Sequence, residues 1–337
     1  MIEEFTSAEG DEKKPFLAVV SWPTPHGPFT PAPWAEHMYD GLKAPRDPNF
    51  NPSDDQQEQK HWIIRQQGPV NPGTEFHLDK THEKRVESLQ SVDEQVGMIV
   101  DLLKRKGELD NTYIIYTSDN GFSLGQHRLG SDKRHMYETD IRVPFVVSGP
   151  GFPRNVKTDR VVLNVDIAPS IYELITGDSG PHQDMDGVSF VPYLKSLQEA
   201  LENDEDDTTT VEDPYYREDV LVSYYGEGNP ECGLKIKDCA TMPHPEHFRI
   251  IDGFNNTYHC LRSLTFGDYQ PSSLSTSERK DSIYCKFDDS EDFVEYYDHL
   301  KDPWQLQNRA DNLTEQERNW FEARIAELRL CKGANCK

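Results

Sequence analysis

The sequence lacks any apolar run of the roughly 20 residues that a membrane-spanning helix needs. Its first 14 residues are acidic and contain no apolar segment of the kind found in a secretory signal peptide. Basic residues are also scarce: 35 Lys and Arg stand against 60 Asp and Glu, which gives a formal net charge of −25. This balance argues against nucleic-acid binding, because no basic surface is available in bulk. We therefore expect no membrane span and no nucleic-acid partner.

Cysteine is missing from the first two thirds of the chain, and six cysteines follow in the last third. No Cys-x₂-Cys pair occurs among them, which argues against a structural zinc site. An even number of cysteines confined to one region instead predicts disulfides and an oxidising compartment. The disulfide candidates are Cys232, Cys239, Cys260, Cys285, Cys331 and Cys336.

Two N-glycosylation motifs accompany the cysteines, one at Asn255 and one at Asn312. Together with the cysteines they predict a lysosomal or secreted protein. Because no leader peptide opens the chain, we expect that an N-terminal part of the protein is missing from it. The sequence carries no signature of oligomeric state.

Residues 112–121 combine a β-prone run with polar residues at its end. Apolar residues on both faces of residues 113–117 predict a buried parallel strand. Ligands in open α/β sheets bind at the carboxyl ends of such strands, which is where Asp119 and Asn120 follow. Their hard oxygens suit Ca²⁺ or Mg²⁺ better than zinc. Gly121 would let the backbone turn tightly around such an ion.

An Asn-Gly pair after a β-prone run is also a strong hairpin signal, so a hairpin stands as the alternative. Residues 122–130 show no alternating partner strand, however, and have the composition of a glycine-rich polar loop. Upstream, apolar residues at spacings of three and four predict an amphipathic helix over residues 83–106, ended by Gly107. Helix, buried strand and loop together predict one unit of a doubly wound α/β sheet.

Further segments extend this prediction on both sides. Residues 15–22 and 142–148 predict two more buried strands, and the first leads into a ligand-type loop that carries His26. Residues 166–177 predict a helix with Asp166 as its cap.

An acidic insert over residues 199–214 marks a domain boundary, because its run of Asp, Glu and Thr predicts a solvated segment. We expect residues 1–198 to form an α/β domain and residues 215–337 to form a small α+β domain that contains the disulfides. Short strands are predicted at 219–225, 259–266 and 293–297, and an amphipathic helix at 316–330.

Two cationic residues extend the candidate site. Lys133 is a compact point charge of the kind that holds a tetrahedral anion. His26 is able to bind an anion or to pass a proton. With Asp119 and Asn120 they form a coherent set, which consists of a metal site, an anion clamp and a proton donor.

A series of short segments places these residues in a specific order: 24–30, 44–47, 60–66, 117–121, 132–134, 137–138, 165–169, 186–189, 226–228, 255–260 and 285–289. On these segments the chain resembles the type I formylglycine-dependent sulfatases, and within them the enzymes that act on 6-sulfated glucosamine. The resemblance covers nearly the whole chain apart from the acidic insert.

The resemblance implies an alkaline-phosphatase-like mixed sheet with flanking helices in residues 1–198, incomplete on its N-terminal side. It implies a sulfuric ester hydrolase that removes 6-O-sulfate from glucosamine in heparan and keratan sulfate degradation, with a sulfated glycosaminoglycan as its partner. Asp119 and Asn120 would bind an active-site Ca²⁺. Lys133 and His26 would contact the substrate sulfate, and His26 would also be a candidate general acid. Many sulfatases carry a substrate-contacting histidine where His127 lies, although glucosamine-6-sulfatases need not.

The chain departs from the family pattern at its nucleophile. The motif Cys/Ser-x-Pro-x-Arg, whose cysteine becomes formylglycine, does not occur, and none of the paired aspartates follows a buried strand. Without these residues the metal keeps two of the about six to eight ligands that Ca²⁺ takes. We therefore predict little or no turnover by the chain as it stands.

Two other hypotheses stay open. A non-catalytic relative would retain a glycan-binding or metal-binding surface without hydrolysis. A phosphatase or phosphodiesterase of the same superfamily would share the fold and the metal-binding edge.

Overall fold

The computed structural model describes residues 15–337 except 181, 183, 204–210, 212, 214, 227–255, 266–279, 334, 335 and 337. The chain groups into two compact units. Unit 1 consists of Met1–Arg46, Val70–Tyr116 and Val146–Pro150, and unit 2 of Asp47–Pro69, Thr117–Phe145 and Gly151–Lys337. The predicted boundary at residues 199–214 stays a prediction, because most of that segment lies outside the described residues. No helix in the described ranges is both long and apolar enough to cross a bilayer.

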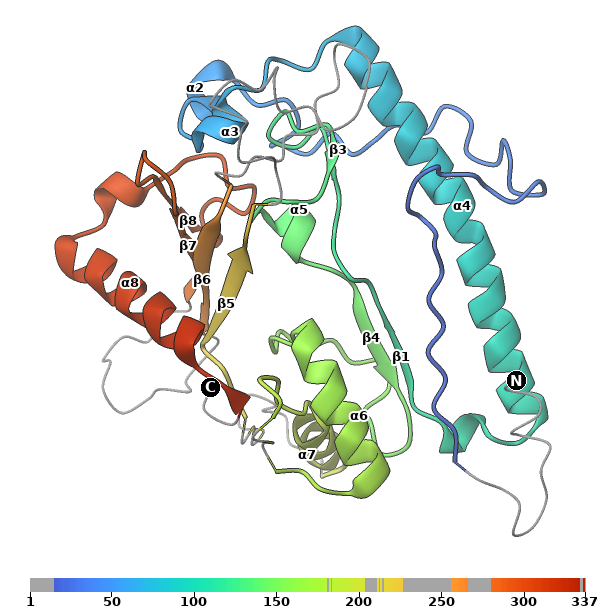
Figure 1. Ribbon diagram of the computed structural model, residues 1–337. Helices are drawn as coiled ribbons and strands as arrows, with labels where there is room; N and C mark the ends of the chain where they lie inside the picture. Colours follow the sequence, from blue (N-terminus) through green and yellow to red (C-terminus); the bar gives the residue numbers. More distant parts are fainter. Residues whose placement is uncertain are drawn as a thin grey trace. The chain divides into compact units, whose positions relative to one another are not determined.

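Unit 1 is built around the long helix α4, Pro72–Arg105 (Figure 1). The helix begins well before the predicted start at residue 83, because the side chain of Asn71 caps it. The Asn71 oxygen accepts hydrogen bonds from two backbone amides of the first turn at 2.9 and 3.0 Å, and Pro72 suits the first helical position. The helix ends as predicted at Gly107, which adopts φ +69°.

Strands β1 (Ile114–Thr117) and β4 (Phe145–Ser148) pair with each other, which confirms a strand within each of the two predicted segments. The strands are not buried on both faces, however, because Tyr116 is 37% exposed and Val146 is 59% exposed. Their sheet has two strands within the described residues, so neither strand has the two neighbours and two covering layers of a buried parallel strand.

The segment over residues 15–22 forms no strand, so the prediction of a buried strand there is wrong. Leu17 and Val19 are 62% and 79% exposed. An apolar run becomes a strand only where a neighbouring strand takes up its backbone hydrogen bonds, and no described strand pairs with this segment.

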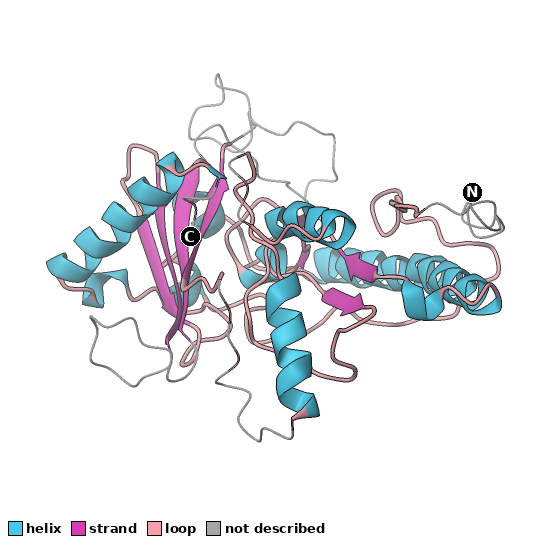
Figure 2. Ribbon diagram, turned by 90° about the horizontal axis from the view of Figure 1, so that it is seen from below, coloured by secondary structure: helices cyan, strands magenta, loops and turns pink. Residues whose placement is uncertain are grey.

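Unit 2 contains a four-stranded antiparallel sheet in the order β5–β6–β7–β8 (Figures 1 and 2). Its strands are Asp219–Tyr224, Tyr258–Thr265, Lys280–Phe287 and Val294–Asp298. Strands β5, β6 and β8 and helix α8 (Glu315–Leu330) confirm the predicted short strands and C-terminal helix. Strand β7 is missed by the sequence analysis.

Successive residues of β6 and β7 face opposite sides of this sheet, as the period of two in a strand requires. Cys260 and Cys285 lie in a buried cluster with the residues of α3 (Trp62–Arg65). Leu261 and Tyr284, their neighbours in the chain, lie in a second cluster with residues of α8. Both faces of the sheet are therefore covered.

Two disulfides confirm part of the cysteine prediction. Cys260 and Cys285 are directly opposite each other on β6 and β7 and are bonded in the buried cluster. Cys331 and Cys336 close a short loop after α8. Cys232 and Cys239 lie outside the described residues.

The other regular elements are short. They are α2 (Asp54–Gln57), η2 (Leu109–Asn111), β2 (Ser123–Leu124), β3 (Ser131–Asp132), α5 (Glu138–Ile141), η3 (Asn164–Asp166), α6 (Ile167–Thr176), α7 (Val191–Glu202) and η6 (Ala310–Asn312).

Helix α6 lies where the sequence predicts a helix, but Asp166 does not cap it with its side chain. The buried Asp166 carboxylate instead accepts hydrogen bonds from the backbone amides of Leu163 and Val188, both at 2.9 Å. It also pairs in a bidentate manner with Arg217 at 2.8 and 2.9 Å. Asp166 therefore joins three separate segments of unit 2.

Candidate functional site

The predicted metal-binding residues follow β1 in a hydrogen-bonded loop of unit 2. Asp119 is exposed, and its Oδ1 accepts a hydrogen bond from the amide of Asn120 at 3.0 Å. Asn120 Nδ2 donates to the carbonyl oxygen of Gly121 at 2.8 Å. Asn164 Nδ2 donates to the carbonyl oxygens of Ser118 and Asp119 at 3.1 and 3.2 Å. Hydrogen bonds within the loop and from Asn164 hold its backbone, while the Asp119 carboxylate is exposed to solvent.

Asn164 was not among the predicted site residues. The sequence does mark Asn164 as unusual, because it is a polar residue that follows the apolar run 161–163 and lies two residues before the predicted helix. The local sequence does not show which strand end this residue contacts, because that contact depends on how the chain folds over a long distance.

Gly121 is needed in this loop for a reason other than the predicted tight turn. A Cβ atom on Gly121 would lie 1.9 Å from the carbonyl oxygen of Thr139. The amide of Gly121 donates to the carbonyl oxygen of Asp140 at 2.8 Å, so the loop packs directly against the backbone of α5. The glycine therefore allows a close approach of two backbones.

Asp119 and Asn120 fit a Ca²⁺ site in donor type, because both carry hard oxygens. They do not fit in number. Among the described residues, no group of three His, Cys, Asp or Glu ligand atoms within 4.8 Å includes Asp119. Ca²⁺ takes about six to eight oxygens, so these two residues supply only a minor part of such a site.

Unit 1 brings together three carboxylates that the sequence analysis did not predict. The ligand oxygens of Asp40, Glu83 and Glu87 lie within 4.8 Å of one another. The two glutamates are buried on α4, where they accept hydrogen bonds from the backbone amides of Gly41 at 2.8 Å and Tyr39 at 3.4 Å. These bonds fasten the preceding loop to the helix and give the two buried carboxylates a structural role.

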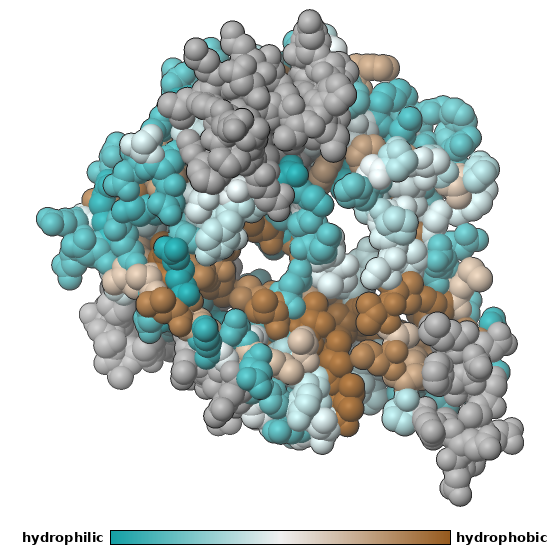
Figure 3. All heavy atoms as spheres, viewed as in Figure 1, coloured by the Kyte–Doolittle hydropathy of each residue, from teal (hydrophilic) through white to brown (hydrophobic). Residues whose placement is uncertain are grey.

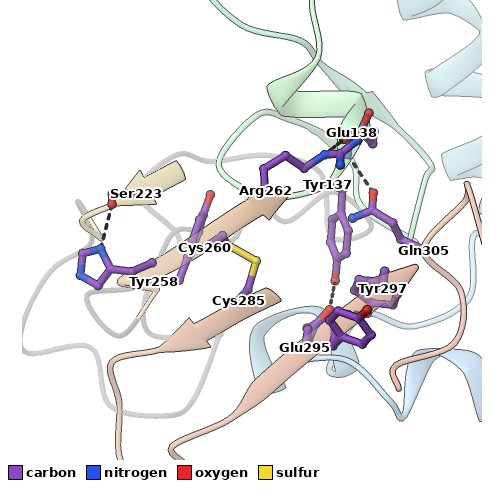
Figure 4. The surroundings of a disulfide bond; sticks show 12 residues. Tyr137, Glu138, Ser223, Tyr258, Cys260, Arg262, Cys285, Glu295, Tyr297 and Gln305 are labelled. Atoms are coloured by element: carbon purple, nitrogen blue, oxygen red, sulfur yellow. Dashed lines mark hydrogen bonds and ion pairs between the residues drawn. A yellow bond between two sulfur atoms is a disulfide. The ribbon is translucent and has the colours of Figure 1, made fainter. Parts of the chain in front are cut away.

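Lys133 lies on the loop between β3 and α5 and is half-buried. The residues that follow it are firmly anchored: the buried Tyr137 donates from its hydroxyl to Glu295 Oε2 at 3.1 Å. The amide of Glu138 donates to the side chain of Gln305 at 2.9 Å. Figure 4 shows Tyr137 beside Glu295 of β8, and Glu138 beside Gln305, which follows that strand in the sequence. The start of α5, which follows the Lys133 loop, is thus anchored to β8 and to the segment after it.

A buried polar cluster supports this anchor. Glu295 accepts hydrogen bonds from the hydroxyls of Tyr137 and Tyr297 and, at 2.7 Å, from the backbone amide of His61. Lys60 donates to the Tyr297 hydroxyl at 2.6 Å, and burial lowers the pKa of Lys60 to about 8. Burial also raises the pKa of Tyr137 and of Tyr297 well above the usual value. The cluster ties α3, β8 and the Lys133 loop together.

The structure places His127 in the core of unit 2. Its side chain is fully buried, and its ring stacks on that of Tyr137 with 3.9 Å between centroids. Burial lowers the pKa of His127 well below the usual value, and the nearby Lys60 ammonium lowers it further. His127 is therefore a neutral packing residue here, and its contact with substrate stays a prediction.

His26 lies in unit 1, whereas the other predicted site residues lie in unit 2. Its side chain is exposed, and its Nδ1 lies 3.1 Å from the carbonyl oxygen of Gly27. The backbone amide of His26 donates to Pro23 at 3.0 Å, and Arg85 of α4 donates to the carbonyl oxygen of Pro25 at 3.3 Å. Helix α4 therefore fastens the loop while the imidazole stays accessible.

Comparison with known sequences identifies relatives over nearly the whole chain. A family model described as Sulfatase matches residues 1–177. N-acetylglucosamine-6-sulfatase from Bos taurus is 37% identical over 329 residues, which cover 96% of this chain and 53% of that protein. The chain thus spans about half the length of the curated relatives it matches.

Solved structures support the fold. A protein solved in complex with its substrate D-glucosamine-2-N,6-O-disulfate is 24% identical, with a TM-score of 0.52 over 76% of this chain and 41% of that chain. The phosphonate monoester hydrolase from Silicibacter pomeroyi is 18% identical, with a TM-score of 0.59 over 91% of this chain and 53% of that chain. At these identities the likeness concerns the α/β fold alone. Because the family model covers more than half of its residues, the chain belongs to the sulfatase family.

Proposed function

We propose that this chain belongs to a sulfuric ester hydrolase that removes 6-O-sulfate from glucosamine in sulfated glycosaminoglycans. The observation that carries the proposal is the 37% identity to N-acetylglucosamine-6-sulfatase over 96% of the chain. The fold neighbour solved with a glucosamine 6-O-sulfate supports the same substrate class.

Lys133 and His26 would act on the substrate directly. The Lys133 ammonium would hold the sulfate and stabilise the negative charge that grows on its oxygens as the ester breaks. The chain that follows Lys133 is anchored through Tyr137 and Glu138, which supports a fixed position for the backbone of this segment. The exposed imidazole of His26 would contact the sulfate or give a proton to the departing sugar oxygen.

Asp119 and Asn120 would provide two of the ligands of a Ca²⁺ ion. A divalent cation at this position, when bound, supplies positive charge that polarises the sulfate ester. The two disulfides and the two glycosylation motifs support a lysosomal or secreted location.

The chain itself is expected to show little or no release of sulfate. The motif Cys/Ser-x-Pro-x-Arg does not occur in the sequence, so the chain has no residue in the context from which the family forms its nucleophile. Hydrolysis of a phosphoryl ester is the second candidate, and the TM-score of 0.59 with a phosphonate monoester hydrolase favours it at the level of the fold.

Titration calorimetry with glucosamine 6-sulfate, glucosamine 6-phosphate and glucosamine tests the proposal, together with an assay for released sulfate. We expect the sulfated sugar to bind more tightly than glucosamine, with no release of sulfate. Lys133→Ala should weaken binding of the sulfated sugar severalfold. Lys157→Ala, which removes an exposed lysine of the same unit, is the matched control and should change nothing.

Equal affinity for the sulfated and the unsulfated sugar would contradict the proposed substrate class. Tighter binding of the 6-phosphate would favour the phosphoryl-ester candidate, and clear sulfate release would disprove the predicted lack of turnover.

A further inference from the structure

Asn312 ends a short 3₁₀ turn on the surface of unit 2, directly before α8. The turn η6 covers Ala310–Asn312, and the amide of Asn312 donates to the carbonyl oxygen of Arg309 at 3.0 Å. The side chain of Asn312 is exposed, and the chain continues as Leu313-Thr314. An exposed Asn-x-Thr segment is the acceptor motif for N-linked glycans.

Thr314 has a structural role in the same motif, because it is the N-cap of α8. Its Oγ accepts a hydrogen bond from the amide of Glu317 at 3.2 Å and donates to Glu317 Oε2 at 2.8 Å. Asp and Asn cap helices as well as Thr does, but neither completes a glycosylation motif. The two roles of Thr314 can therefore be separated by substitution.

A polar hollow lies beside Asn312. Its volume is about 500 Å³, within the usual range of pockets for small ligands. Side-chain amides dominate the lining, and such groups hydrogen-bond to sugar hydroxyls and N-acetyl groups. The lining residues are Ser53, Asp55, Gln56, Gln59, Gln307, Asn308, Arg309 and Asn312.

We propose that Asn312 carries an N-linked glycan whose first N-acetylglucosamine packs in this hollow. Asn312 Nδ2 forms a bond to C1 of the sugar, which a lipid-linked diphosphate oligosaccharide supplies. The bond between C1 and the diphosphate oxygen breaks, the lipid diphosphate leaves with the electron pair, and the amide loses one proton. The Cys260–Cys285 and Cys331–Cys336 disulfides agree with passage through the oxidising compartment where this transfer occurs.

Site-specific mass spectrometry of the chain secreted from mammalian cells behind an added leader tests the modification. Trypsin releases Asn312 on its own peptide, residues 310–318, apart from the second motif at Asn255. Release of the glycan by peptide N-glycosidase in H₂¹⁸O then marks an occupied Asn312 by its mass.

We expect glycosylation of Asn312 to depend on the Asn-x-Ser/Thr motif and not on whether residue 314 caps the helix. The wild type and Thr314→Ser are modified at Asn312, whereas Asn312→Gln and the cap-preserving Thr314→Asp are not. An unmodified 310–318 peptide in the secreted wild-type protein overturns the proposal.

Two enzymes test the place of the first sugar. Endoglycosidase H leaves one N-acetylglucosamine on a high-mannose site, whereas peptide N-glycosidase leaves an aspartate, which the variant Asn312→Asp reproduces. We expect backbone amides of residues 53–59 and 307–309 to exchange hydrogen severalfold more slowly with one sugar retained than with none. Gln307→Ala, which removes an exposed amide of the hollow, should reduce this protection. Equal exchange in the two trimmed forms excludes the hollow as the sugar's position.

Discussion

Gly121 is required by the space around it. Because a Cβ at this position would lie 1.9 Å from a backbone oxygen of α5, Gly121→Ala must displace either the site loop or the helix. We expect unit 2 to lose about 1–3 kcal/mol of unfolding free energy, as overpacking typically costs. Urea unfolding followed by fluorescence measures the change.

Gly97→Ala is the matched control for this substitution. Nothing lies within 4 Å of a Cβ at Gly97 in the interior of α4, so alanine should be neutral or stabilise by about 0.5–1 kcal/mol. Equal losses in both variants would show that the close contact at Gly121 is not the cause.

Two buried histidines make the stability of unit 2 sensitive to acid. Burial lowers the pKa of His135 to about 3, and the nearby Arg134 guanidinium lowers it further. The unfolded chain, with a histidine pKa of about 6.5, therefore takes up a proton first as the pH falls. The stability conferred by neutral His135 is complete above pH 6.5 and declines toward pH 3, by about 1.4 kcal/mol per pH unit. His127 acts in the same direction.

Unfolding measured at pH 7, 6, 5 and 4 checks this dependence. His135→Gln removes the titrating group, so the decline below pH 6.5 should be shallower in the variant than in the wild type. An identical pH dependence in the two proteins would assign the acid sensitivity to other groups.

At the scale of elements, the two disulfides offer a comparison within one unit. They close loops of very different size, with sequence separations of 25 and 5. Replacing both Cys260 and Cys285 by alanine should lower the free energy of unfolding by roughly 3.5 kcal/mol, as loop-closure entropy predicts. The same replacement of Cys331 and Cys336 should lower it by roughly 2 kcal/mol. Burial of the first pair increases the difference, because its removal also leaves a cavity. Denaturant unfolding of the two double variants should give this order, and the reverse order would contradict it.

Local sequence patterns predict correctly the helices and strands whose packing partners are present in the same unit. Helix α8 and strands β5, β6 and β8 pack within unit 2, and their spacing in the sequence is enough to place them. Residues 15–22 fail for the opposite reason, because their apolar pattern requires neighbouring strands that local sequence cannot supply. The start of α4 at Pro72 precedes the apolar spacing from which the helix is predicted, although Asn71-Pro72 is itself a start signal.

In the candidate site, too, the features that depend on local sequence were predictable, and the contacts between distant segments were not. A strand followed by Asp119 and Asn120 is a local pattern, and the structure has it. The contact of Asn164 with that loop and the burial of His127 arise from distant parts of the chain, so spacing does not reveal them. The roles of Lys133 and His26 stay predictions.

At the scale of the whole molecule, unit 1 combines few buried apolar residues with highly exposed apolar side chains. Its buried apolar residues within the described ranges are Ala35, Ala44, Leu78, Val92 and Leu103, whereas Val19 and Val146 are 79% and 59% exposed. Apolar side chains reach the visible surface in Figure 3. Such a surface favours association in water.

Val19→Asp and Val146→Asp should therefore reduce self-association. Val19→Asp should leave thermal stability unchanged, because Val19 is exposed and lies outside any described strand, whereas Val146→Asp should lower it slightly because Asp is disfavoured in strand β4. Sedimentation velocity over a range of protein concentrations measures the effect. Leu330→Asp places the same charge on an 83% exposed residue of unit 2 and serves as the control. A reduction of equal size in the control would attribute the effect to net charge alone.

The core beneath the small sheet cannot form until late in synthesis, because its two halves are far apart in the sequence. His61 Nε2 lies 2.8 Å from Asp289 Oδ2, and Trp62 Nε1 donates to the same oxygen at 2.9 Å, across 228 and 227 residues of sequence. At ribosomal speeds of about 5–20 residues per second, α3 emerges on the order of 10–45 seconds before its partner exists. Throughout that interval Trp62, Ile63 and Ile64 lack the sheet that covers them in the folded protein, so the nascent chain exposes this apolar segment to solvent.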